Sequence, residues 1–249
     1  NSPNNILGIE YIKSILKLNS NIKPYTINRV NSGYNSLNIN NSICSASAIR
    51  NALKTDSLAT INYTMPKPTY DLINDTVNSG VNLVYNDDFY QILSSIILRD
   101  KDNLTDYFEV NEGIENKIYN SIFKCQNIEE LQNEIKSKRY TMTKISRTLN
   151  NIMLGIKRDD ILKTKDLKEM PYVRVLAFND KGCEILKEIK KNSEIEVITK
   201  FSKIKHIDSD IFNTLINYDI KATNMYSLIY NKSLLKGPMD YITSPKYIK

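Results

Sequence analysis

Residues 70–158 carry apolar side chains at helical spacing through several consecutive segments, and this pattern changes abruptly further on. The apolar sets recur every three or four residues in YDLINDTV, DDFYQILSSIIL and GIENKIYNSIF, which predicts helices with one buried face. From residue 172 the run YVRVLAF reads as a strand, followed by the helical DKGCEILKEIKK and a second strand, EIEVIT. We therefore expect a helical domain and then a small α/β domain built on a βαβ-like unit.

Capping residues predict where two of these helices begin and end. Asn127 with Glu130 forms a capping box for IEELQNEIKS, and the next helix starts at Thr141 and stops at Gly155. Its apolar stripe faces a core, so the basic side chains of that helix lie away from the core. Further along, the pattern predicts two helices, over 209–218 and 222–230, and an irregular tail, GPMDYITSPKYIK.

The first sixty residues have a different organisation. ILGIEYIKSILKL reads as a helix preceded by asparagines, PYTINRV at 24–30 as a short strand, and residues 31–42 as a loop rich in Asn, Ser and Gly. A second helix follows in SICSASAIRNALK, with Ser45 or Ser47 as its N-cap. This order of helix, strand, loop and helix fits the closing unit of an α/β nucleotide-binding domain, and MPKPT at 65–69 marks its boundary.

Composition excludes several classes of protein. No apolar run approaches the roughly 18 to 20 residues that cross a bilayer, and no secretory signal opens the chain. The three cysteines are far apart, which suggests reduced thiols, a cytoplasmic protein and no metal site. The one histidine, His206, excludes any motif that needs two histidines within these residues, and we expect His206 itself to be structural.

Charge is distributed unevenly along the chain. Residues 61–135 hold five Lys and Arg against thirteen Asp and Glu, whereas residues 136–205 hold eighteen against nine. Such asymmetry is typical of a protein that turns a basic surface toward a polyanion. Solvated helix charges of both signs would give the same counts, so charge alone leaves both interpretations open.

Two segments have the composition of a nucleotide site. In SASAIR, small residues at a helix start allow backbone N–H groups to approach a phosphate, and Arg50 one turn later can add a forked contact. In PNNILGIEYIK, the Asn4 and Asn5 amides precede a helix and can read an adenine edge or a ribose. Helix capping explains either segment equally well when it is taken alone.

Taken together, PNNILGIEYIK, TINR and SASAIR resemble the bacterial tRNA(Met) cytidine acetate ligase family, whose first domain is nucleotidyltransferase-like. The patterns KRYTMTKISRTLNNIMLGI and YVRVLAFNDKGCEIL resemble the same family, so the likeness spans nearly the whole chain. Ala46 and Ala48 stand where the wider group often has hydroxyl side chains, which leaves Ser45, Ser47 and backbone amides for phosphate.

The resemblance implies an enzyme that activates acetate with ATP, accompanied by Mg²⁺, to acetyladenylate and then acetylates the wobble cytidine of elongator tRNA(Met). It assigns the pair Asn4 and Asn5, which it does not separate, together with Arg29, Ser45, Ser47 and Arg50, to ATP. The HxGH-type motif of the family needs two histidines, so it is not among these residues. We expect a C-terminal portion that lacks the HxGH half and is inactive alone.

The predicted organisation has three parts: the C-terminal part of a Rossmann-like nucleotidyltransferase domain at 1–64, a helical domain at 65–165 and a small α/β domain at 166–249. The predicted contacts to tRNA backbone are Lys138, Arg139, Lys144 and Arg147. Two other functions remain open. One is a non-catalytic RNA-binding module, and the other is a small-molecule adenylyltransferase, which an extended basic surface disfavours.

Overall fold

The computed structural model describes residues 3–27, 39, 43–55, 58–167, 169–204, 207, 209–230 and 238–248, with the side chains of residues 3 and 4 left out. The chain forms two compact units, Asn1–Asn78 and Ser79–Lys249. The sequence-based division into three domains stays a prediction.

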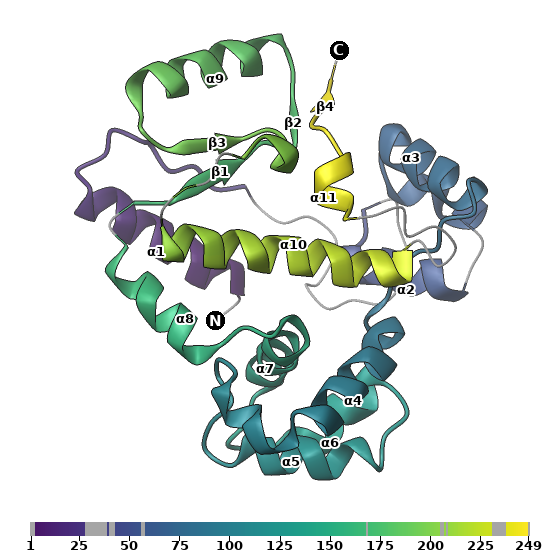
Figure 1. Cartoon of the computed structure of the whole chain (residues 1–249). Coiled ribbons are helices and arrows are strands. Elements are labelled where there is room, and N and C mark those ends of the chain that lie inside the picture. Colours follow the sequence, from purple (N-terminus) through teal and green to yellow (C-terminus); the bar gives the residue numbers. More distant parts are fainter. Residues whose placement is uncertain are drawn as a thin grey trace. The chain divides into compact units, whose positions relative to one another are not determined.

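The regular structure described in the first unit is helical (Figure 1). Its elements are α1 (Pro3–Lys17), α2 (Ala46–Thr55), the 3₁₀ turn η1 (Leu58–Thr64) and α3 (Lys67–Asn78). The strand predicted at 24–30 is wrong for residues 24–27, which have no regular secondary structure, because a strand needs a ladder partner and none pairs with them among the described residues. Residues 28–30 lie outside the described residues.

The second unit begins with a helical layer. Its elements are η2 (Asn86–Phe89), α4 (Tyr90–Arg99), η3 (Lys101–Asp106), α5 (Ile114–Ile122), α6 (Ile128–Ile135), α7 (Met142–Leu154), α8 (Arg158–Lys163) and η4 (Thr164–Asp166). The core between α4, α5, α6 and α7 buries apolar side chains at helical spacing, among them Ile118, Leu131 and Ile145 at 0% exposure. The helices predicted from periodicity in this layer are confirmed.

The predicted starts of α6 and α7 and the predicted end of α7 are confirmed, whereas α6 ends at Ile135, two residues earlier than predicted. The Thr141 side chain accepts a hydrogen bond from the Lys144 backbone N–H, and Gly155 ends α7 in the left-handed conformation at φ 68°. The Asn127 side chain caps α6 in the same way, by accepting from the Glu130 N–H. Capping is a local interaction, so these boundaries were readable in the sequence.

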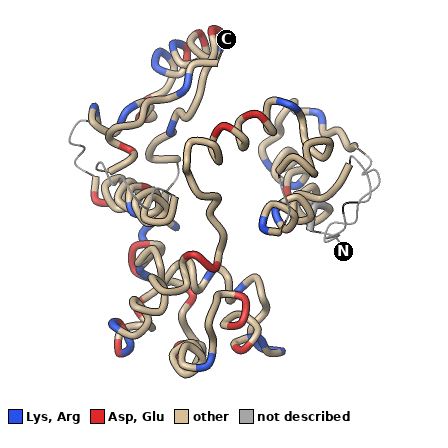
Figure 2. Tube along the Cα trace, turned by 90° about the vertical axis from the view of Figure 1, so that its right-hand side faces the viewer, with Lys and Arg blue, Asp and Glu red and all other residues tan. Residues whose placement is uncertain are grey.

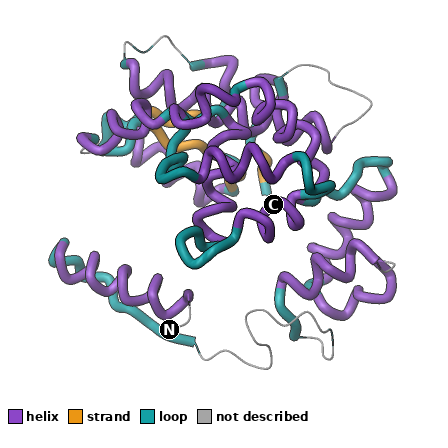
Figure 3. Tube along the Cα trace, turned by 90° about the horizontal axis from the view of Figure 1, so that it is seen from below, coloured by secondary structure: helices purple, strands orange, loops and turns teal. Residues whose placement is uncertain are grey.

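The α/β part follows in the same unit. It contains β1 (Tyr172–Arg174), β2 (Ala177–Phe178), α9 (Asp180–Asn192), β3 (Glu196–Ile198), η5 (Phe201–Lys203), α10 (Asp210–Tyr230), α11 (Met239–Ile242) and β4 (Lys246–Tyr247). Strand β1 precedes α9 in the sequence and β3 follows it, and the two strands pair in parallel. This pairing confirms the βαβ-like unit. Figure 3 shows the short strands gathered within the helices.

Three predictions for this part need correction. The run 172–178 is two strands, because β1 pairs with β3 while β2 pairs in parallel with β4. The tail predicted as irregular contains α11 and β4. The two helices predicted at 209–218 and 222–230 are one continuous helix, α10, because no Gly or Pro interrupts the sequence and α10 packs against α7, α8 and α11 (Figure 1).

Candidate functional site

Three of the residues predicted for ATP lie at the N-terminal end of α2. Ser45 is buried and its Oγ accepts a hydrogen bond from the Ala48 backbone N–H at 3.0 Å, so Ser45 caps the helix. Ser47 and Arg50 are exposed. The structure therefore brings these three residues together, with a hydroxyl and a guanidinium open to solvent at a positive helix end.

The other predicted ATP residues lie elsewhere. Asn5 is exposed near the start of α1, whereas the Asn4 side chain and Arg29 fall outside the described residues. Within the segment 28–42, which lies between α1 and α2, the structure describes only Ile39. Ile39 is not one of the predicted site residues. The assignment of Asn4, Asn5, Arg29, Ser45, Ser47 and Arg50 to one ligand thus stays a prediction.

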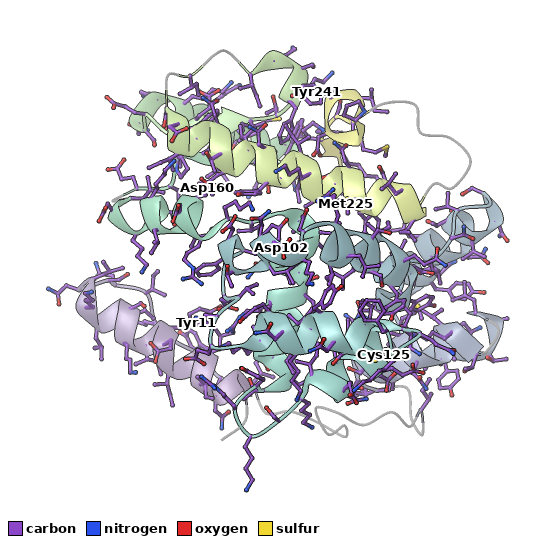
Figure 4. The ribbon with its side chains drawn as sticks, turned by 60° about the horizontal axis from the view of Figure 1, so that its bottom comes forward. Tyr11, Asp102, Cys125, Asp160, Met225 and Tyr241 are labelled. Carbon is purple, nitrogen blue, oxygen red and sulfur yellow. The ribbon has the colours of Figure 1, made fainter. Side chains whose placement is uncertain are left out.

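One face of α1 is apolar and open in this structure. Ile9 and Leu16, which lie on this face, are 53% and 70% exposed. Beside this face runs a groove of about 480 Å³, lined by α1 residues such as Tyr11, labelled in Figure 4, and by the following segment to Thr26. No described residue covers the apolar face of α1.

The four residues predicted for tRNA lie at the start of α7 and just before it. Lys138 and Arg139 are exposed, Lys144 is half-buried and Arg147 is exposed. Arg139 Nε and Lys144 Nζ lie 3.6 and 3.5 Å from the same Glu112 carboxylate oxygen. The side chains of Arg139 and Lys144 therefore lie close together, and the Glu112 carboxylate forms ion pairs with both.

A second carboxylate belongs to the same surface. Arg147 Nε lies 3.0 Å from Glu109 Oε2, so the two carboxylates pair with three of the four cations. We call these six residues the charged cluster: Glu109, Glu112, Lys138, Arg139, Lys144 and Arg147. Figure 2 shows Lys and Arg interspersed with Asp and Glu over this helical part of the chain.

The loop that carries both carboxylates is fastened to the rest of the unit through its carbonyl groups. The Tyr140 hydroxyl donates to the Glu112 carbonyl at 2.6 Å, and Arg158 donates to the Val110 carbonyl at 2.8 Å. Asn151 likewise donates to the Phe108 carbonyl at 2.9 Å. These bonds hold the loop in a conformation that the isolated sequence would disfavour.

Both carboxylate residues have left-handed backbones. The φ angles of Glu109 and Glu112 are 63° and 62°, which costs a non-glycine residue on the order of 1 kcal/mol. Sequence analysis missed the two residues as part of the site. The available signal was the turn-like composition of EVNEG, which ends at Gly113 with φ 87°.

The described part of the chain holds no group of three or more His, Cys, Asp or Glu side chains that could bind a metal ion. The first turns of α1 and α2 also lack acidic residues, so neither described helix end offers a carboxylate to a cation. None of the helices described is both long and apolar enough to cross a membrane.

A family model described as HIGH Nucleotidyl Transferase matches residues 1–238, which is nearly the whole chain. The chain belongs to this family. The nucleotidyltransferase relationship inferred from PNNILGIEYIK, TINR and SASAIR is thereby confirmed.

Curated relatives have one name in common. The tRNA(Met) cytidine acetate ligase of Clostridium acetobutylicum is 46% identical over 242 residues, which are 96% of this chain and 56% of the relative. The protein of the same name from Clostridium perfringens strain ATCC 13124 is 42% identical and matches 98% of this chain and 58% of its own length. The chain therefore spans less than two thirds of the relatives that it matches.

Solved structures give the same result. Apo Thermotoga maritima TmcAL superposes with a TM-score of 0.85 at 27% identity, over 98% of this chain and 60% of that protein. A second structure, of Thermotoga maritima TmcAL bound with alpha-thio ATP, has a TM-score of 0.82 at 26% identity and covers 99% of this chain and 59% of that protein. The nucleotidyltransferase-like α/β fold, rich in helices, is thus the fold of this chain.

Proposed function

We propose that this chain is part of an enzyme that activates acetate with ATP and acetylates the wobble cytidine of elongator tRNA(Met). The observation that carries the proposal is the 46% identity, over 96% of the chain, to a protein named tRNA(Met) cytidine acetate ligase. Structural similarity to a homologue bound with alpha-thio ATP supports the nucleotide as a substrate.

In this proposal α1 and α2 contribute one side of the ATP site. Asn4 and Asn5 at the start of α1 and Arg29 after it contact the nucleotide, while Ser45, Ser47 and Arg50 serve the phosphates at the start of α2. The dipole of α2 and the exposed Arg50 favour negative charge at that point. The Mg²⁺ that accompanies ATP is not assigned to residues of this chain, because neither described helix end carries a carboxylate.

The chemistry of the proposed reaction sets what these groups have to do. Acetate oxygen attacks the α-phosphorus of ATP, pyrophosphate leaves, and the cytidine N4 then attacks the acetyl carbonyl and releases AMP. Arg50 and the α2 backbone stabilise charge on the phosphates. The single histidine means that an HxGH-type motif is not within these residues, so we expect the chain alone to form no acetyladenylate.

The charged cluster provides the proposed contact to the tRNA backbone. Lys138 has no acidic partner among the ion pairs of the described residues, and the remaining three cations exchange a carboxylate for a phosphate when RNA binds. Contacts of this kind give affinity and register without reading bases.

A binding and turnover experiment tests the proposal. We expect the purified chain to bind elongator tRNA(Met) and to show no acetate-dependent release of pyrophosphate from ATP. A variant with Lys138, Arg139, Lys144 and Arg147 all replaced by Ala should bind more weakly and with a shallower salt dependence, by roughly 0.7 to 0.9 in log–log slope per lost phosphate. Equal affinities and slopes for the two proteins would place the RNA elsewhere.

The runner-up function is a non-catalytic RNA-binding module. The observation that favours it is the single histidine, since the chain then offers RNA contacts without the motif that grips ATP phosphates. ATP binding measured by calorimetry separates the two functions. Saturable binding that Arg50→Ala weakens supports the ligase and would overturn the module.

A further inference from the structure

A buried carboxylate in the α/β part has one oxygen without a partner. Asp240, on α11, is only 3% exposed, and its Oδ1 accepts a hydrogen bond from the Arg174 guanidinium. No residue that the structure describes donates to Asp240 Oδ2. Because a buried carboxylate oxygen without a donor is costly, this atom is suited to a donor from outside the described residues.

Asp240 lines a cavity of about 60 Å³ at the junction of β1, β3 and the segment after α11. A volume of this size holds a few water molecules, so it admits the edge of a planar molecule and not a whole ring. The lining combines apolar and hydroxyl-bearing residues and includes Phe201, Thr199, Thr243, Ser244 and Pro245.

Arg174 gives the cavity a donor beside the acceptor. Its guanidinium lies 4.6 Å from the centre of the Phe201 ring, and its side chain is 29% exposed, so it is partly reachable from solvent. A guanidinium has five N–H groups, of which one bonds Asp240. The pair therefore presents an acceptor and donors side by side, which matches the adjacent donor and acceptor on the edge of a nucleobase.

The surroundings of the cavity are basic. Lys200 and Lys203 flank Phe201 in sequence, and Lys246 follows Pro245. Such cations suit a ligand whose heterocycle is attached to phosphates. Single-stranded RNA is recognised in this manner, by hydrogen bonds to the edge of an unstacked base and by contact with aromatic and Arg planes.

We propose that this cavity receives the edge of one unpaired RNA base, which donates an N–H group to Asp240 Oδ2 and accepts a hydrogen bond from Arg174. The inference deepens the proposed function, on which it rests for its choice of RNA as the source of the base. A free nucleotide carries the same edge and is the other source to be distinguished.

The first experiment measures the affinity of the chain for a transcript of elongator tRNA(Met) at several salt concentrations. Ser244→Leu narrows the mouth of the cavity at an exposed residue, and Ser202→Leu makes the same change at an exposed residue outside the lining. We expect Ser244→Leu to weaken binding about tenfold with an unchanged salt slope, because a base contact releases no counterions. Ser202→Leu should bind like the wild type.

Asp240→Asn tests the acceptor directly, because it removes the charge of the carboxylate. We expect the same loss of affinity for the RNA, about tenfold. If loss of the Arg174 ion pair unfolds this variant, Ser244→Leu carries the test alone. Equal affinities of Ser244→Leu and Ser202→Leu for the RNA would overturn the proposal.

The second experiment titrates AMP, CMP, GMP and UMP separately and follows the backbone amide resonances of Thr199 and Thr243. Saturable shifts in the wild type that disappear in Ser244→Leu support recognition of a base edge in the cavity. If the chain binds these nucleotides but not the tRNA, the proposed RNA contact fails while the cavity site stands, with free nucleotide as its source. No shifts together with no tRNA binding would overturn both.

Discussion

Arg147 Nε lies 3.0 Å from Glu109 Oε2, although the Glu109 backbone has to adopt φ 63° to bring the carboxylate there. Glu112, at φ 62°, does the same for Arg139 and Lys144. The loop thus holds two residues in a strained backbone conformation that places their carboxylates beside a basic surface. A phosphate that binds this surface has to compete with those two carboxylates for the cations.

Replacement of Glu112 tests that competition. In Glu112→Gln, Arg139 and Lys144 lose their shared carboxylate, so we expect the chain to bind elongator tRNA(Met) roughly threefold more tightly, with a steeper salt dependence. Glu129→Gln, at an exposed position of α6, removes the same charge away from the cluster and should leave affinity nearly unchanged. Weaker or equal binding by Glu112→Gln would contradict the role of the cluster in RNA binding.

Acid stability should depend on Asp100. The hydrogen bond from Arg99, 2.7 Å from Asp100 Oδ1, is the largest cause that lowers the pKa of this carboxyl from 3.8 to about 2, and the Tyr107 hydroxyl also donates to it. Because the folded pKa is below the unfolded one, the stabilisation is complete above about pH 4 and is lost as pH falls through about 2. After solvent screening we expect it to be worth about 1 kcal/mol.

The measurement is urea unfolding between pH 2 and pH 7. Asp100→Asn should be less stable than the wild type at pH 7, and the difference should shrink toward pH 2. Asp102→Asn changes an exposed neighbour that has no ion pair among those described, and its unfolding free energy should follow the wild-type pH profile. A constant difference between Asp100→Asn and wild type at all pH values would rule out the linkage.

Tyr218 joins α10 to α8. Its hydroxyl donates to Asp160 Oδ2 at 2.6 Å and accepts from the Lys157 backbone N–H at 3.0 Å, and Figure 4 labels Asp160 on α8. Tyr218→Phe removes both hydrogen bonds, so the free energy of unfolding should fall by about 1 to 3 kcal/mol. Tyr226→Phe, on the same helix and 48% exposed, should cost much less. Similar losses in the two variants would show that the Tyr218 bonds contribute nothing specific.

Gly155 ends α7 at φ 68°, where a side chain is strained whatever space surrounds it. A Cβ there would meet only Lys221 Nζ at 3.9 Å, so the cost of Gly155→Ala is conformational, and we expect a loss of about 1 kcal/mol in thermal or urea unfolding. Gly8→Ala is the control, because Gly8 is inside α1 with open space around it, and Ala should stabilise that helix. A neutral Gly155→Ala would mean that the C-cap tolerates another geometry.

The sequence by itself determined the elements whose signals are local, and with them the family. Thr141 and Gly155 set the ends of α7, Asn127 set the start of α6, and Ser45 the start of α2, because a cap needs only neighbouring residues. Periodicity likewise predicted the core residues of the helical layer.

Only the tertiary structure decided what distant residues do together. Glu109 and Glu112 oppose cations some thirty residues away, and Arg174 meets Asp240 across 66 residues, in contacts that no local pattern encodes. The continuity of α10 and the division of 172–178 between two partner strands are of the same kind. These features depend on burial and on pairing between remote segments. The free energy that burial and pairing contribute is gained only when the chain folds.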